Sequence, residues 1–150
     1  HIIYLSKNHY YYGILKPFDG VTPYRLEMQA KASIGNYKDL YDYWGSDLYE
    51  QLTLDDNHVI LNLASKEYSK CIEKYLQPKD CYITCVFAEL INGKAVQKGT
   101  LAKMARGEMV RYLAENKIED LEGVKKFPGL GYEFSKSLSK EFEYVFIKRA

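Results

Sequence analysis

Short runs of apolar residues alternate along the chain with longer stretches in which apolar residues recur every three or four positions. The first pattern is typical of buried strands and the second of amphipathic helices. Strands are predicted at residues 2–5, around 25–29, and at 59–64, 81–90, 94–99, 132–134 and 142–148. Helices are predicted at residues 37–52, from the N-cap Ser65 to about residue 76, at 100–116 with Thr100 as candidate N-cap, and at 118–126.

The order of these elements predicts an α/β fold of mixed α+β character, in which a mixed sheet is flanked by helices. Residues 59–76 show the strand, short turn and helix of a βα unit, which is typical of parallel pairing. Asn92-Gly93 between two apolar runs is a strong hairpin signal and predicts an antiparallel pair. A length of 150 residues suits one domain. The chain is therefore predicted to form a single domain over residues 1–150.

Composition narrows the classes of function. Charged residues make up 27% of the chain and the formal net charge is +1, which predicts a folded protein and not a general DNA-coating one. A nucleic-acid role would therefore need a local basic patch. No apolar run approaches the roughly 18 residues of a membrane helix, and the first residues lack the pattern of a signal peptide. We expect a cytoplasmic protein without membrane contact.

Metal, cofactor and enzyme signatures are missing from the sequence. The three cysteines and three histidines show no ligand spacing, so we expect buried free thiols and no metal site. The chain has no G-x-S-x-G, P-loop, dinucleotide or H-E-x-x-H motif. No cofactor is expected, and whether the chain is an enzyme stays open, with the balance against it.

The predicted helix at residues 100–116 carries the most informative chemistry. A helical wheel places Leu101, Ala105, Met109 and Tyr112 on one side, with Ala102 and Leu113 at its edge. The opposite side carries Lys103, Arg106 and Arg111, with the small residues Gly107, Val110 and Ala114 between them. Small residues let a ligand come close while cations hold an anion, and a merely solvated helix would more often interleave acids. The alternative is an ordinary solvated helix face.

A second candidate site lies where the strand near residue 60 gives way to a helix. Asn62, Ser65 and Lys66 carry groups that suit phosphate or carboxylate, and the free N–H groups of a helix start attract anions. Ligands of open α/β sheets also gather at the carboxyl ends of strands. The alternative is a well-capped helix, in which Asn62 only holds the turn.

Two loop segments give weaker signals. Arg25 alternates with Glu27 near two prolines, and the pair could form a structural ion pair or line a cleft. Residues 127–131, Phe-Pro-Gly-Leu-Gly, resemble the hairpin of a helix-hairpin-helix DNA-binding unit. That unit needs a second helix, whereas residues 132–134 favour a strand.

Taken together, these segments resemble the YaaA (peroxide stress) family, in the family's order over nearly the whole chain. The matching segments are Tyr12-Gly13, Lys16-Pro17, residues 23–28 (Pro-Tyr-Arg-Leu-Glu-Met), 41–45 (Tyr-Asp-Tyr-Trp-Gly), 62–65 (Asn-Leu-Ala-Ser), Glu67-Tyr68, Val86-Phe87, Ala102-Lys103, 105–107 (Ala-Arg-Gly), Arg111, Glu115-Asn116, Gly131-Tyr132, Val145-Phe146 and Lys148-Arg149.

The resemblance implies a cytosolic bacterial protein linked to survival of hydrogen peroxide, with a distinctive α/β fold and a basic cleft that binds DNA. By position, Lys103, Arg106 and Arg111 would line that cleft, with Lys16 and Arg25 nearby. The family usually has two adjacent lysines before Ala-Arg-Gly, whereas the second position here is Met104. The resemblance also identifies this chain as the C-terminal portion, without the family's long N-terminal part.

Three hypotheses follow. The first is DNA binding in the peroxide stress response, with Lys and Arg contacting backbone phosphates without reading sequence. The second is an enzyme or binding protein for a small phosphorylated or nucleotide ligand at the turn from Asn62 to Lys66. The third is a structural module that presents an interaction surface.

Overall fold

The computed structural model describes residues 2–5, 28, 35–54 and 59–149. Contacts divide the chain into two compact units, which we describe separately. The sheet unit comprises His1–Tyr4, His58–Leu63 and Cys81–Ala150, and the helical unit comprises Leu5–Asn57 and Ala64–Asp80. The single-domain prediction for residues 1–150 stays a prediction.

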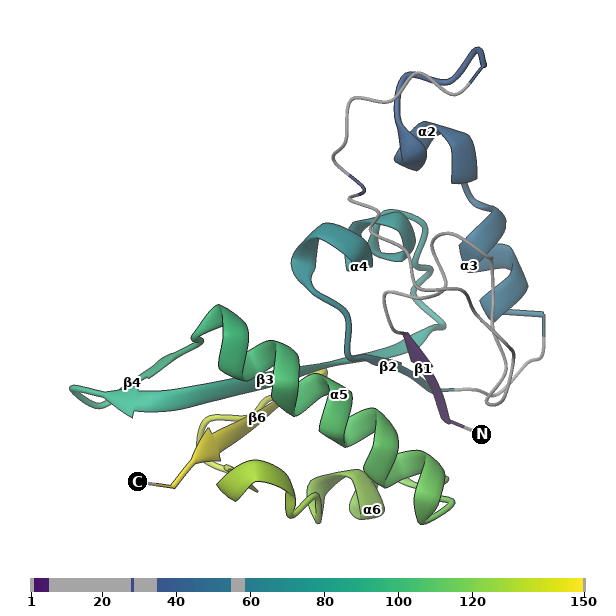
Figure 1. Cartoon of the computed structure of the whole chain (residues 1–150). Helices are drawn as coiled ribbons and strands as arrows, with labels where there is room; N and C mark the ends of the chain where they lie inside the picture. The colour runs from purple at the N-terminus through teal and green to yellow at the C-terminus, as the bar shows by residue number, and fades with distance from the viewer. Residues whose placement is uncertain (1, 6–27, 29–34, 55–58, 150) are drawn as a thin grey trace. The chain divides into compact units, whose positions relative to one another are not determined.

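A mixed sheet forms the centre of the sheet unit, which confirms the predicted fold class (Figure 1). Its strands lie in the order β1 (Ile2–Leu5), β2 (Val59–Asn62), β3 (Cys81–Ile91), β6 (Glu143–Lys148) and β5 (Tyr132–Phe134), and β4 (Lys94–Val96) pairs with β3. Strand β3 pairs in parallel with β2 and β6, whereas β4 pairs antiparallel with β3 and β5 antiparallel with β6.

The long strand β3 forms because its apolar residues alternate. Ile83, Cys85 and Phe87 point into one core, and the residues between them are half-buried. The predicted hairpin is also confirmed: Asn92 and Gly93 have φ values of 50° and 74°, as a two-residue turn requires. The return strand is shorter than predicted, because β4 ends at Val96.

Helix α5 (Gly99–Glu115) covers one face of this sheet, and α6 (Leu121–Lys125) follows it (Figure 1). The buried side of α5 consists of Ala102, Ala105, Met109 and Leu113. It is rotated from the predicted side, because Leu101 and Tyr112 are only half-buried. The Tyr112 hydroxyl donates to the backbone oxygen of Gly123 at 3.1 Å, so this ring lies at the flank of the helix, towards α6. The N-cap is Lys98, and the expectation for Thr100 is wrong.

Aromatic rings fill the space between α5, the sheet and the segment after α6. Phe87 stacks on Phe146 with ring centroids 5.2 Å apart and meets Tyr132 and Phe127 edge-on at 5.4 and 5.9 Å. Such pairs add to the stabilisation from burial by about 0.5–1.5 kcal/mol each. This cluster fixes α5 on the sheet, and with it the side chains that α5 presents to solvent.

The helix-hairpin-helix interpretation of residues 127–131 is wrong. This segment ends in the 3-10 turn η1 (Gly129–Gly131), and strand β5 follows at once. Leu130 and Gly131 both have positive φ, 55° and 73°, which turns the chain back into the sheet. A second helix would remove Tyr132 from the aromatic cluster.

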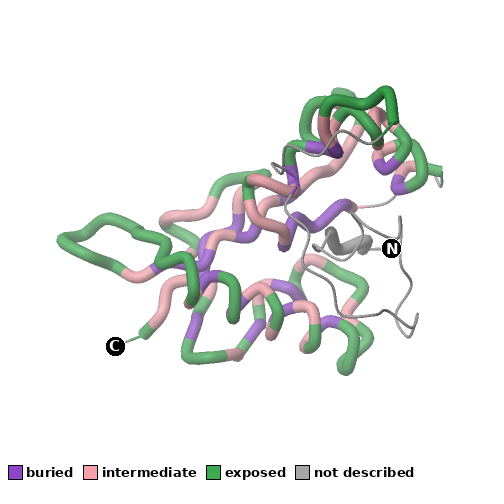
Figure 2. The backbone as a smooth tube through the Cα atoms, turned by 45° about the horizontal axis from the view of Figure 1, so that its top comes forward, coloured by how far each residue is buried: buried purple, intermediate pink, exposed green. Residues whose placement is uncertain are grey.

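The helical unit contains α2 (Leu40–Trp44), α3 (Asp47–Leu52) and α4 (Lys66–Glu73). The predicted helix at 37–52 is thus two helices, because Gly45 adopts φ of 48° between them. Within this unit the Tyr41 hydroxyl donates to the backbone oxygen of Glu67 at 2.6 Å, and the Tyr49 hydroxyl to Asp80 at 2.8 Å. Figure 2 shows that buried positions alternate with exposed ones along the short helices.

Candidate nucleic-acid interface

Helix α5 determines where the predicted basic residues lie. Lys103, Gly107 and Arg111 are exposed and Arg106 is half-buried, because the opposite side of the helix is held in the core. Lys103, Arg106 and Gly107 follow one another at positions i, i+3 and i+4, so they form one continuous stripe. The structure therefore brings these three together, with Arg111 one turn further along.

Arg106 differs from the other cations of α5. Its Nε donates to the backbone oxygen of Ala102 at 3.1 Å, which turns the guanidinium back along the helix. Burial lowers the pKa of Arg106 from its ordinary value, although arginine remains cationic at neutral pH. No carboxylate pairs with Arg106 among the residues that the structure describes. A partly desolvated and uncompensated cation favours an anionic partner.

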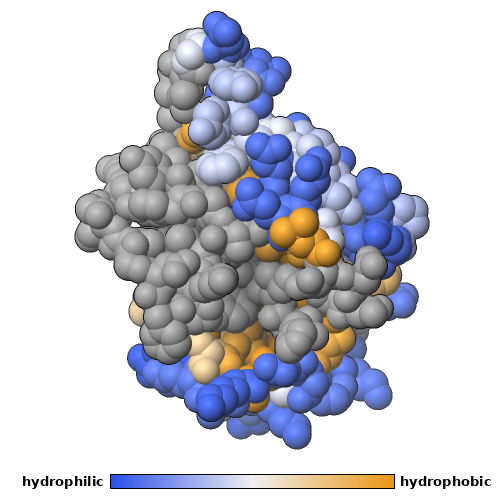
Figure 3. Space-filling view, turned by 90° about the vertical axis from the view of Figure 1, so that its right-hand side faces the viewer, coloured by the Kyte–Doolittle hydropathy of each residue, from blue (hydrophilic) through white to orange (hydrophobic). Residues whose placement is uncertain are grey.

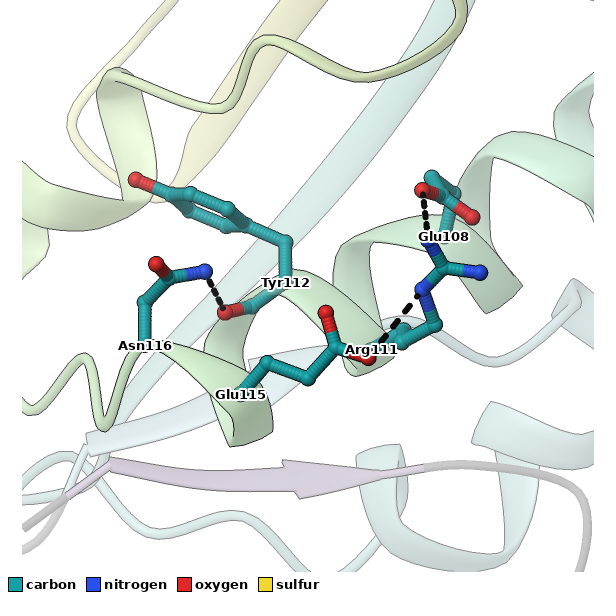
Figure 4. Close-up of polar contacts among 5 residues, drawn as sticks. All are labelled: Glu108, Arg111, Tyr112, Glu115 and Asn116. Atoms are coloured by element: carbon teal, nitrogen blue, oxygen red, sulfur yellow. Dashed lines mark hydrogen bonds and ion pairs between the residues drawn. The ribbon is translucent and has the colours of Figure 1, made fainter.

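Arg111 is compensated by two acids of its own helix (Figure 4). Its Nη2 lies 3.4 Å from Glu108 and its Nε 3.4 Å from Glu115, one turn to either side. The expectation that acids do not interleave on this face is thus wrong for the second half of α5. A phosphate at Arg111 would have to displace these contacts, so this residue offers an anion less than Arg106 does. The signal was present in the sequence, as acids at i−3 and i+4 from Arg111.

The first half of α5 leaves room for a ligand. A Cβ added to Gly107 would meet no atom within 4 Å. Lys103 is exposed and forms no ion pair within the described ranges. An anion could therefore approach the helix backbone at Gly107, beside the two cations.

The residues of the second candidate site belong to different units, Asn62 to the sheet unit and Ser65 and Lys66 to the helical unit. Asn62 is 3% exposed, and its Nδ2 donates to the Thr84 hydroxyl of the neighbouring strand at 3.3 Å. Ser65 is the N-cap of α4, as predicted, but its side chain makes no capping hydrogen bond. Lys66 is exposed. A shared site of these three residues stays a prediction.

Lys16 and Arg25 lie outside the described residues, so their predicted place beside the cleft stays a prediction. The strand predicted near 25–29 also lies outside them, except for Met28, which is buried.

The three thiols are held in their protonated form. Burial raises the pKa of Cys85 and of Cys81, and it raises that of Cys71 to about 12. Cys71 and Cys85 are buried free thiols, as predicted, whereas Cys81 is free but only half-buried, so the prediction of burial is wrong for Cys81. Within the described residues, no group of three His, Cys, Asp or Glu side chains could hold a metal ion.

In the part of the chain that the structure describes, no helix has both the length and the apolar character to cross a bilayer. On the face shown in Figure 3, most of the described surface is hydrophilic, with hydrophobic residues exposed in small areas.

Comparisons with known proteins agree with the resemblance seen in the sequence. The family model described as peroxide stress protein YaaA matches residues 4–138. A UPF0246 protein of Agathobacter rectalis is 60% identical over 139 residues, which are 93% of this chain and 55% of that protein. A UPF0246 protein of Lachnoclostridium phytofermentans is 56% identical over 92% of this chain and 54% of its own length. A UPF0246 protein of Clostridioides difficile is 46% identical over 91% of this chain and 55% of its own length. The chain thus spans about half the length of these relatives.

Proposed function

The chain belongs to the YaaA family of peroxide stress proteins, and from that premise we propose that it acts in the cytoplasmic response to peroxide by binding DNA. The binding surface is the first half of α5, with Lys103 and Arg106 as phosphate contacts and Gly107 beside them. The chain spans about half of its relatives' length, so binding by the whole protein is itself part of this proposal.

The observation that supports the proposal most is the state of Arg106. Its guanidinium is half-buried, and none of the described carboxylates compensates its charge. Ion pairs within the helix supply that compensation for Arg111. A purely solvated face would have no reason to keep one cation partly desolvated and unpaired.

Such a surface would recognise the DNA backbone and not the base sequence. A phosphate oxygen can accept hydrogen bonds from the Arg106 guanidinium and the Lys103 ammonium, and Gly107 lets it approach without meeting a side chain. Each neutralised phosphate releases a counterion, and the logarithm of affinity falls by about 0.9 per tenfold rise in salt. The two contacts with Lys103 and Arg106 therefore predict weak binding, with an affinity whose logarithm falls by about 1.8 per tenfold rise in salt.

Fluorescence anisotropy of a short labelled duplex, titrated at several salt concentrations, tests this proposal. Arg106→Glu is expected to weaken binding strongly and to lower the salt slope by about one or more. Arg111→Glu is the matched control: it makes the same charge change on the same helix, and it is expected to have the smaller effect.

Two results would count against the proposal. If Arg111→Glu weakened binding as much as Arg106→Glu, total charge and not the unpaired guanidinium would be responsible. If neither this chain nor the full-length Agathobacter rectalis relative bound the duplex, DNA would not be the ligand.

A small phosphorylated or nucleotide ligand is the second candidate. It is favoured by Ser65, whose hydroxyl leaves the N-terminus of α4 without a side-chain cap beside the exposed Lys66. Saturable protection from thermal unfolding by a nucleotide, without protection by DNA, would support it.

A further inference from the structure

Strands β3 and β4 continue beyond the rest of the sheet as a two-stranded ribbon. The pairing of β3 with β6 ends at Ala88 and Ile147, whereas β3 runs on to Ile91 and returns as β4 (Figure 1). Residues 89–96, here called the β3–β4 ribbon, pair only with one another among the described strands. Within the described part of the chain, the ribbon therefore has no sheet neighbour on either side.

Large apolar side chains are exposed on this ribbon. Leu90, Ile91 and Val96 are 54%, 41% and 40% exposed. Single exposed apolar residues are ordinary, but three within seven residues form a cluster that needs a reason.

The pairing register distributes the cluster over both faces of the ribbon. Val96 lies opposite Glu89 and therefore shares a face with Ile91, which is two residues from Glu89. Leu90 and Ala95 lie opposite each other on the other face. A partner that lay on one face alone would leave apolar side chains of the other face exposed, so covering all three requires contacts on both faces.

The ribbon has little to stabilise it alone. A two-stranded hairpin is marginally stable in water, and its open edge invites association. The Lys98–Glu89 ion pair holds its base at 2.5 Å, but that pair contributes little because Lys98 is exposed. Burial of the three apolar side chains by another segment would supply the stabilisation that the ribbon lacks.

We propose that, in the full-length protein, the portion of the polypeptide outside this chain covers both faces of the β3–β4 ribbon. The relatives are nearly twice as long as the segment they share with this chain, so each of them contains a further portion of sufficient size. Covalent connection gives that portion a high effective concentration, which favours it over a second copy. The proposal is independent of DNA binding, because the ribbon contains none of the residues proposed to contact phosphate.

Hydrogen–deuterium exchange in the full-length Agathobacter rectalis relative tests the proposal. The ribbon amides are expected to exchange at least about tenfold more slowly than in the 150-residue chain, with the buried turns of α5 as the internal reference in both proteins. Ribbon amides that exchange in the full-length relative as fast as unstructured peptide would overturn it. Protection that falls when the protein is diluted would also overturn it, since the occupant would then be a second copy.

A second measurement uses this chain alone. It is expected to bind a fluorescent dye for apolar surfaces, and the triple variant Leu90→Ser, Ile91→Thr, Val96→Thr is expected to lose most of that signal. Met104→Ser is the matched control, because Met104 is 54% exposed on α5 outside the ribbon. If Met104→Ser removed the signal and the triple variant kept it, the ribbon would not be the uncovered surface.

Discussion

Alanine at two glycines of the sheet unit should change stability in opposite directions. At Gly129 an added Cβ would lie 2.3 and 2.6 Å from ring carbons of Phe127 and 2.9 Å from Cγ of Glu108. Phe127 is 2% exposed and contacts the rings of Phe87 and Phe146, so it cannot move without disturbing the aromatic cluster. Overpacking of this kind costs about 1–3 kcal/mol.

Gly107 is the matched control within the same unit. It is exposed on α5, and an added Cβ would meet nothing within 4 Å. Alanine is favoured over glycine in a helix interior by about 1 kcal/mol, so Gly107→Ala should stabilise the fold. The two variants should therefore differ in unfolding free energy by about 2–4 kcal/mol, with the unchanged protein between them.

Urea unfolding followed by far-ultraviolet circular dichroism measures this difference, and hydrogen exchange of the α5 amides localises it to the sheet unit. If Gly129→Ala were as stable as the unchanged protein, the Phe127 ring would be free to move and the aromatic cluster would not hold α5 in place. Gly107→Ala also reports on function: a better fold with weaker DNA binding would indicate that phosphate approaches the helix backbone there.

Two further predictions concern titration. Because burial raises the pKa of Cys71, Cys81 and Cys85, thiolate should be scarce in the native chain at neutral pH. The native chain should therefore lose thiol to hydrogen peroxide far more slowly than the urea-unfolded chain. Rapid loss of thiol in the native chain would contradict this. The pKa of Tyr41 is raised from 10.0 to about 12, chiefly by burial, so the folded chain keeps a proton that the unfolded chain loses in this window. The free energy of unfolding should therefore fall as pH rises from about 10 to 12, which urea unfolding at several pH values measures. The variant Tyr41→Phe should make this fall shallower. If the dependence of the free energy on pH were unchanged in Tyr41→Phe, other groups would cause it.

The sequence predicted those parts of the fold that depend on neighbouring residues. The β-rich run at 81–90 predicted β3, and Asn92-Gly93 predicted the hairpin, because a two-residue turn with positive φ admits few residues. Helix 37–52 was predicted as one helix because apolar spacing continues across Gly45. Gly45 adopts a φ of 48° and caps the end of α2, and the apolar spacing does not contain that conformation.

The candidate interface on α5 was likewise predictable only in part. Its residue types and spacing were visible in the sequence, and so were the acids beside Arg111. The rotation of α5 was not, because Tyr112 reaches the backbone of Gly123, eleven residues away in the chain.

By itself, the sequence determined the element types, the hairpin, the family and the basic composition of α5, since these follow from local pattern. Only the tertiary structure decided that Arg106 is half-buried and uncompensated within the described residues, whereas Arg111 is paired. It also decided that Leu90, Ile91 and Val96 extend past the sheet. Burial and exposure depend on which distant segments pack together, and no local pattern of residues contains that information.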